Sequence, residues 1–319
     1  PMISDRGGKG CHPRIYIRPL VWEEYQQWQD ASQGRVRIIT LAPEVEGALD
    51  LIPRLTNDGV IVAIGHSDAS KEIIHEAVKR GAKLATHLWN ACKKELARDL
   101  EHVGAMLAED ELCASFIADG HHIHPDTLKI SFRSKGMDKS ILVTDAMAGA
   151  GAGDGRYLLG DLEIEVVNGV ARDPNNLTQL AGSTLTMEQA VERAVRFGQI
   201  TLAEAVRMAT VNSASLLNRE YEVELKESRV ADLVLFSFEN NNLKVKKVMR
   251  AGELISIDEK GGNCPYCGSW KIEQDPRSVW YTDDLGPTVR PENGEWLCWG
   301  CGALFDFVSR RVRTFALIV

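Results

Sequence analysis

The sequence predicts an α/β protein with a parallel sheet, and two observations support this prediction. Short runs of apolar and β-branched residues recur at intervals of roughly 20–30 residues, with helix-like segments between them, as in repeated β/α units. Each run ends in an ionisable or polar residue. A β/α barrel collects functional side chains at the carboxyl ends of successive strands, so we expect that architecture. A doubly wound sheet fits the number of strands equally well, but it would concentrate its site at one switch point.

The strands and the first helix are expected at defined places. The predicted strands are 36–44, 61–68, 83–91, 113–122 and 140–147. The segment 69–81 predicts a helix, because its apolar residues share one face and Gly81 suits a helix end. Those apolar residues are Ile73, Ile74, Ala77 and Val78.

The pattern changes after residue 147. A Gly/Ala-rich loop over 148–156 precedes 157–173, which predicts a hairpin around the Asn168-Gly169 pair. Two amphipathic helices are expected in TMEQAVERAVRFG and TLAEAVRMATVNSASLLN. The segments VADLVLFSF and LKVKKVMRAGELISI then predict strands of a small β-structure. We therefore expect three parts: a β/α part over 1–228, small β-domain strands over 229–258 and a tail over 259–319.

Composition excludes several classes of function. The net charge of −8 is spread without long single-sign blocks, which does not favour nucleic acid or anionic membranes as partners. No apolar run is long enough for a membrane span, and no signal peptide opens the chain. Four of the seven cysteines form two Cys-x-x-Cys pairs, which favours a reducing compartment, and we expect the cytoplasm.

Chemistry is expected at the strand ends. His66 and His87 end neighbouring predicted strands, and Asp145 ends a later one. Two neutral imidazoles can bind a divalent metal such as Zn²⁺, and a carboxylate facing its water can act as a general base. A single buried histidine more often satisfies backbone groups, but three matching strand ends favour a metal site.

A set of motifs in order carries a family resemblance. These are TLAPE, GHSDA, THLWNA, ADGHHIHP, LVTDAMAGAG, LAGSTLTM and ADLVL...VMRAGELI. Together they resemble the N-acetylglucosamine-6-phosphate deacetylase family of the amidohydrolase superfamily, from residue 1 to about 257. The resemblance implies a (β/α)8 TIM barrel of the metallo-dependent hydrolase type with a small β-domain. It also implies release of acetate from N-acetylglucosamine 6-phosphate with a divalent metal, expected to be zinc.

The resemblance assigns roles to individual residues. His66 and His87 become metal ligands, and Asp145 becomes the catalytic acid/base that takes a proton from water and passes it to the departing amine. His122 is implied to bind the substrate and stabilise the oxyanion, and Arg98 to reach the phosphate from the partner subunit of a homodimer. The full set of implied substrate-binding residues is His122, Asn90, Ala91, Arg98, His12 and Leu180.

The resemblance also implies a missing beginning. The opening PMISDRGGKGCHP aligns with family sequence that follows a His-x-Glu-Gly motif, whose Glu is a principal metal ligand. We therefore expect an N-terminally truncated enzyme without its first barrel strands, or a decayed relative. An alternative hypothesis is that Glu44 substitutes for the lost ligand.

The tail predicts a separate zinc site. Four thiolates in two Cys-x-x-Cys-Gly knuckles can surround one structural Zn²⁺ as a zinc ribbon, although reduced free cysteines and disulfides are alternatives. The cysteines are Cys264, Cys267, Cys298 and Cys301. The tail has 7 basic and 8 acidic residues, so its bulk charge does not support nucleic-acid binding.

Two alternative functions stay open. One is an amidohydrolase that opens cyclic amides, for which Arg98 and His12 would be indifferent to a substrate phosphate. The other is an inactive remnant whose zinc-ribbon tail serves as a binding module. His75 and His102 lie away from the predicted strand ends, and we expect both on the surface.

Overall fold

The structure is a computed structural model that describes residues 1–92, 101–255, 280–283, 286–289, 295–298 and 303–306. The chain divides into two compact units, which we describe separately. The first contains Pro1–Thr144 and Gln189–Glu224, and the second contains Asp145–Glu188 and the described residues from Leu225 onward. The described helices include none that is long and apolar enough to cross a membrane.

The first unit is organised by a five-stranded parallel sheet. Its strands are β1 (Ile38–Leu41), β2 (Ile61–Ile64), β3 (Leu84–Ala85), β4 (Cys113–Ile117) and β5 (Ser140–Val143). All five predicted strands are confirmed. The spatial order β1-β2-β3-β4-β5 follows the chain, so the described strands contain no switch point of the kind that a doubly wound sheet requires. This winding is that of a β/α barrel.

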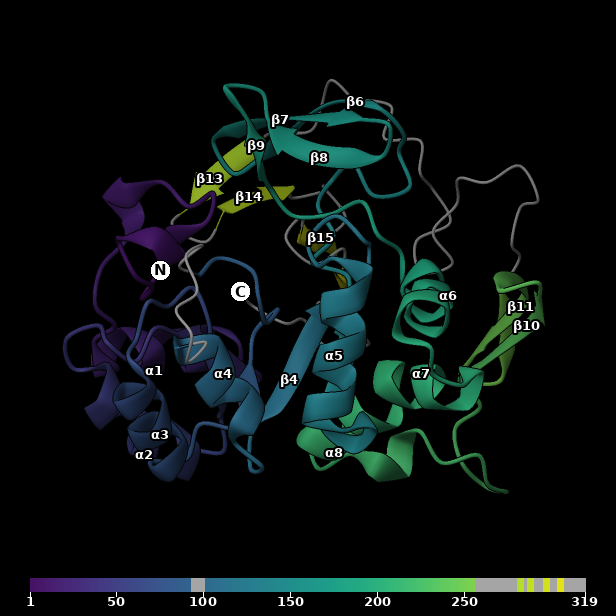
Figure 1. Ribbon diagram of the computed structural model, residues 1–319, viewed down its shortest axis with the longest axis horizontal. Coiled ribbons are helices and arrows are strands. Elements are labelled where there is room, and N and C mark those ends of the chain that lie inside the picture. Colours follow the sequence, from purple (N-terminus) through teal and green to yellow (C-terminus); the bar gives the residue numbers. More distant parts are fainter. Residues whose placement is uncertain (93–100, 256–279, 284–285, 290–294, 299–302, 307–319) are drawn as a thin grey trace. The chain divides into compact units, whose positions relative to one another are not determined.

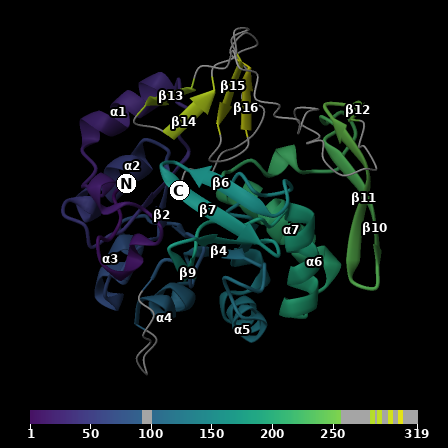
Figure 2. The same cartoon turned by 90° about the horizontal axis from the view of Figure 1, so that it is seen from above.

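Burial explains why these segments form a parallel sheet. In β2 and β4 every residue after the first is buried, which is typical of strands covered on both faces. The covering helices include α2 (Ala48–Asn57), α3 (Lys71–Lys79), α4 (Glu101–Ala108) and α5 (Pro125–Lys135). Figures 1 and 2 show them along the outside of the strands. The helix predicted over 69–81 is α3, and the Ser70 hydroxyl caps it by accepting the N–H of Ile73.

The beginning of the chain forms loops with short helical turns. Two 3-10 turns, η1 (Gly7–Lys9) and η2 (Arg14–Tyr16), precede the helix α1 (Trp22–Ala31). The N–H of Ser4 donates to the carbonyl of His66, and that of Ala42 to the carbonyl of Met2. The N-terminal loop is therefore fixed to the carboxyl ends of β1 and β2.

The later helices differ from the prediction at one residue. The first expected helix is α6 (Met187–Gly198), but the second is divided into α7 (Leu202–Ala209) and α8 (Val211–Leu216). Thr210 separates them with φ −133° and ψ −79°, which is not helical. The Asn212 amide of α8 donates to the carbonyls of Met137, in the turn η3 (Met137–Lys139), and of Ser140, both at 2.7 Å. The break therefore lets α8 dock beside β5.

The second unit consists of antiparallel sheets. The predicted hairpin is confirmed, with Asn168 and Gly169 joining β7 (Leu162–Val167) to β8 (Val170–Asp173). Two strands missed by the sequence analysis, β6 (Gly155–Leu159) and β9 (Asn176–Leu180), complete a four-stranded sheet. The expected small β-structure is the three-stranded sheet of β10 (Leu233–Glu239), β11 (Asn242–Arg250) and β12 (Glu253–Ile255).

The tail contains a further antiparallel sheet. Its strands are β13 (Trp280–Asp283), β14 (Gly286–Val289), β15 (Glu295–Cys298) and β16 (Ala303–Asp306). Cys298 ends β15, whereas Cys264, Cys267 and Cys301 lie outside the described residues. The zinc ribbon therefore stays a prediction.

Candidate active site

Three predicted site residues occupy equivalent positions. His66, His87 and Asp145 each lie two residues beyond the last residue of their strand. Each has a left-handed backbone, with φ of 52°, 31° and 51° respectively. Residues other than glycine rarely adopt this conformation, and it is enriched at functional sites. His66 and His87 are also in register, because Ile64 pairs with Ala85.

The two histidine rings face each other. Their Nε2 atoms are 3.0 Å apart and their ring centroids 4.8 Å apart. Both residues are buried, with 6% and 4% exposure. Burial, then the nearby His87 and His12, hold the pKa of His66 well below its usual range, so its ring is neutral at physiological pH. A neutral ring is the form that binds metal.

A backbone carbonyl fixes the tautomer of His66. Its Nδ1 lies 3.1 Å from the carbonyl oxygen of Gly8, which only accepts hydrogen bonds, so Nδ1 carries the proton and the lone pair is on Nε2. Gly8 must be a glycine here, because a Cβ would lie 2.6 Å from the His66 carbonyl carbon. The Asp68 carboxylate anchors this loop by accepting the N–H of Gly8 and the Ser4 hydroxyl.

The histidine pair fits two positions of a metal shell. Two nitrogens at the zinc–nitrogen distance and a tetrahedral angle are about 3.3 Å apart, close to the separation of the two Nε2 atoms. Within the described ranges, no three His, Cys, Asp or Glu side chains are grouped to hold a metal. The Glu44 carboxylate accepts the Ser67 hydroxyl and the Asp68 N–H, so its role as a substitute ligand stays a prediction.

The strained backbone of His87 is held from the neighbouring strand. Ser115 of β4 accepts the N–H of His87 at 2.8 Å and donates to the carbonyl of Ala85 at 3.1 Å. Ser115 is 1% exposed, so this bond is not exchanged with water. The sequence analysis missed Ser115, because its role is visible only across paired strands.

A second pair follows β4. Asp119 also lies two residues beyond its strand, and its Oδ2 is 2.6 Å from Nδ1 of His122. Burial raises the pKa of Asp119, but hydrogen bonds and charge from His122 outweigh it and leave that pKa below its usual value. The sequence analysis assigned a role to His122 but none to Asp119. The two-residue offset from the strand was the signal that could have identified it.

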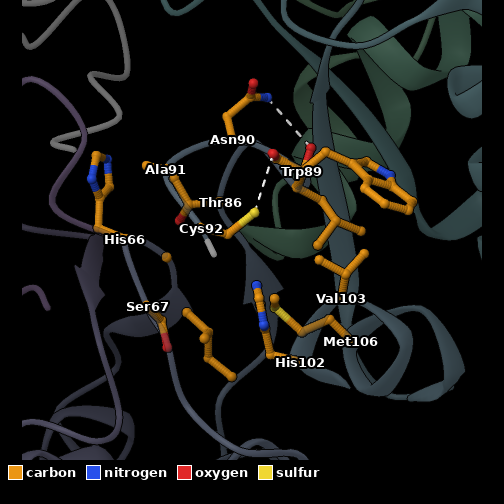
Figure 3. Close-up of a pocket in the computed structure, with 13 residues that line it drawn as sticks. His66, Ser67, Thr86, Trp89, Asn90, Ala91, Cys92, His102, Val103 and Met106 are labelled. Carbon is orange, nitrogen blue, oxygen red and sulfur yellow. Dashed lines mark hydrogen bonds between the residues drawn. The ribbon is translucent and has the colours of Figure 1, made fainter. Parts of the chain in front are cut away.

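A small pocket lies beside His66 in the first unit. Asn90 and Ala91, both predicted to contact substrate, line it together with Cys92 and His102 (Figure 3). Burial raises the pKa of Cys92 to about 11, so the thiol stays protonated.

One surface prediction is wrong and its companion is confirmed. His102 is 1% exposed, not on the surface, because α4 is buried almost throughout. Figure 3 shows its ring in the pocket. The side chain of His75 is 52% exposed, as expected.

His12 lies against the histidine pair. Its ring centroid is 4.9 Å from that of His66, and burial, then the charges of the amino terminus, His87 and Lys9, lower its pKa to about 4. A neutral His12 offers a hydrogen bond but no charge. Its contact with phosphate stays a prediction, as does that of Arg98, which lies outside the described residues.

The segment after Asp145 pairs with the LAGSTLTM motif within the second unit. The Asp145 carbonyl accepts the N–H of Ser183 at 2.7 Å, and the Met147 N–H donates to the Ser183 carbonyl at 2.9 Å. Leu180 ends β9, two residues before Gly182. The two motifs therefore form one local structure, which holds the backbone at Asp145.

Comparisons with known proteins agree with this architecture. The profile of the amidohydrolase family matches residues 30–255, and the chain belongs to that family. The solved structure of a Mycobacterium smegmatis N-acetyl-D-glucosamine-6-phosphate deacetylase mutant, in complex with N-acetyl-D-glucosamine-6-phosphate, superposes with a TM-score of 0.73 at 36% identity. The match covers 80% of this chain and 66% of that one.

Two relatives found by sequence comparison are named as deacetylases of phosphorylated amino sugars. N-acetylglucosamine-6-phosphate deacetylase of Lysinibacillus sphaericus is 37% identical over 254 residues, covering 80% of this chain and 64% of that protein. N-acetylgalactosamine-6-phosphate deacetylase of a Shewanella species is 34% identical over 247 residues, covering 77% of this chain and 61% of that protein. The chain thus spans less than two thirds of the length of these relatives.

Proposed function

We propose that the chain hydrolyses the acetamide of N-acetylglucosamine 6-phosphate to glucosamine 6-phosphate and acetate, with a divalent metal expected to be zinc. The observation that carries this proposal is the pair of Nε2 atoms of His66 and His87, 3.0 Å apart and two residues beyond adjacent parallel strands. The similarity to deacetylases of phosphorylated amino sugars supports it.

The residues of the chain have separable roles in this reaction. His66 and His87 would hold the metal, which supplies Lewis acidity to a carbonyl and to water. Asp145 accepts a proton from the attacking water and returns it to the amine nitrogen as the C–N bond breaks. His122 binds the substrate through Nε2, and Asn90 and Ala91 contact the sugar.

We expect the chain to select its substrate by binding the phosphate group. We assign its contacts to His12 and to Arg98, which reaches the substrate of the partner subunit in a homodimer. A chain with net charge −8 repels a phosphate unless cations or N–H groups are placed for it. We place the reaction in the cytoplasm on the basis of the Cys-x-x-Cys pairs.

Acetate release tests the proposal. The zinc-loaded chain is assayed with N-acetylglucosamine 6-phosphate, with its galactosamine epimer, and with unphosphorylated N-acetylglucosamine. We expect release from the phosphorylated sugars, loss of release in the His66→Ala variant, and full activity in the His75→Ala control at an exposed position. The galactosamine substrate is included because one relative carries that name.

The refuting result needs two proteins, the chain itself and a longer fusion. If neither the chain nor the chain joined to the unmatched part of the L. sphaericus relative releases acetate, the proposal is wrong. Equal activity on the phosphorylated and unphosphorylated sugars would favour an amidohydrolase that acts on cyclic amides.

The tail zinc has its own test. We propose a structural Zn²⁺ held by Cys264, Cys267, Cys298 and Cys301. The zinc content of the Cys264→Ser variant should be one equivalent lower than that of the wild type. In the His66→Ala variant the tail should keep its zinc, because the two sites are separate. Equal zinc content in the wild type and Cys264→Ser would reject the ribbon.

A further inference from the structure

We infer that Asp119 is a positioning residue, which fixes the His122 ring so that Nε2 is the atom presented to the substrate. The inference rests on the proposed function, in which His122 contacts the amino-sugar phosphate. It adds a residue to which the motifs assigned no role.

The side-chain contact determines the tautomer. Oδ2 of Asp119 lies 2.6 Å from Nδ1 of His122, and both side chains are 7% exposed. The pKa of Asp119 is below its usual value, so it is a carboxylate that only accepts hydrogen bonds. Nδ1 therefore carries the proton, and Nε2 is left to accept a hydrogen bond from a substrate group. Nε2 can donate to an oxyanion, as the family resemblance implies, only when the ring carries a second proton.

The same carboxylate also holds the backbone around the ring. Oδ1 of Asp119 accepts the N–H groups of His121 and His122, both at 2.8 Å. One oxygen thus fixes the main chain of His122 and the other fixes its ring. A side chain held at both ends loses its rotamer freedom before a substrate arrives, which lowers the entropic cost of binding.

The turn that carries Asp119 is supported from α6. The Arg193 guanidinium donates to the carbonyl of Asp119 at 3.0 Å. Gly120 has φ 77°, and a Cβ there would lie 3.0 Å from the Phe197 ring. The turn therefore tolerates neither a side chain at 120 nor much displacement against α6.

A purely structural role would need only part of this arrangement. The two backbone N–H bonds would suffice to shape the turn before α5. The bond from Nδ1 of His122 is additional to those two, and it is the contact that orients the ring. An experiment must therefore separate the side-chain bond from the backbone bonds.

The Asp119→Asn substitution makes this separation. The amide oxygen can still accept the backbone N–H groups, while the amide NH₂ donates toward Nδ1 of His122. The ring proton then moves to Nε2. We expect 15N spectra of the imidazole to show Nδ1–H in the wild type and Nε2–H in the variant. We also expect kcat/KM to fall about 10- to 100-fold, with the melting temperature little changed. Asp126→Asn, at a side chain that is 85% exposed, is the matched control and should keep the wild-type spectrum and activity.

Two results would overturn the inference. One is a neutral ring in wild-type His122 whose single proton lies on Nε2 and not on Nδ1. The other is an Asp119→Asn effect on kcat/KM that is as large in a His122→Gln background as in the wild type, because a residue that acts through His122 has little left to lose there.

A failure of the proposed function can be distinguished from a failure of this inference. If the wild type releases no acetate, the ring spectra still decide the tautomer, and N-acetylglucosamine 6-phosphate is added as a probe. A shift of the His122 Nε2 resonance on addition supports Asp119 as a positioning residue for that ligand. An unmoved resonance overturns it.

Discussion

Replacing Ser115 with alanine should weaken both the fold and the proposed metal site. The hydroxyl accepts the N–H of His87 at 2.8 Å and donates to Ala85 at 3.1 Å, in surroundings where Ser115 is 1% exposed. A buried donor left without its acceptor costs about 1–3 kcal/mol. The left-handed backbone of His87 stores about 1–3 kcal/mol that this bond helps to hold. We therefore expect a loss of about 2 kcal/mol in the free energy of unfolding.

The assay pairs this variant with a serine on the next strand. Ser140 is also fully buried, but its hydroxyl donates to the carbonyl of Gly136 and accepts no bond from a histidine backbone. Urea unfolding with a chelator present should show a smaller loss for Ser140→Ala, about 1 kcal/mol. In zinc competition Ser115→Ala should bind about 10-fold more weakly, whereas Ser140→Ala should match the wild type. Equal losses of stability, with unchanged zinc affinity in both variants, would refute the reasoning.

Three other predictions concern buried residues of the first unit. Gly8→Ala places a Cβ 2.6 Å from His66, so thermal unfolding should show a loss of about 1–3 kcal/mol; a wild-type melting curve would contradict this. Phe132 is fully buried, and its ring is 5.3 Å from that of Phe116, so Phe132→Ala should lose about 3–5 kcal/mol in urea unfolding and Phe132→Leu clearly less. Burial lowers the pKa of Lys135 to about 8, so between pH 8 and its unfolded value near 10.5 the unfolded chain binds more protons and stability rises with pH. That rise should be absent in Lys135→Met, and identical pH profiles would exclude the shift.

The parallel sheet was predictable because its strands are buried on both faces. Continuous apolar runs such as 61–64 are distinctive, and their spacing indicates β/α units. Their ends were less predictable. The run 113–122 was expected to be one strand, but β4 ends at Ile117, because the following residues turn around the Asp119 carboxylate. Likewise, helical periodicity continues through Thr210, and only the docking of α8 beside β5 explains the break.

Some residues of the candidate site could be predicted from the sequence, and others could not. His66 and His87 were predicted, since each lies two residues beyond an apolar run. Ser115 and Asp119 were not, because their importance lies in contacts that cross between elements. The burial of His102 was also missed, because the short helix α4 has no polar face that the sequence could distinguish.

The left-handed backbone at His66 and His87 lowers the stability of the fold, while their side chains serve the proposed chemistry. Asparagine and glycine adopt this conformation more easily than histidine, so His66→Asn and His87→Gly relieve strain while removing a side chain that we propose binds the metal. Alanine relieves none of it. A population of variants selected only for thermal tolerance would accumulate asparagine or glycine at these two positions. The proposed metal ligands would then be among the first functional groups to be lost under such selection.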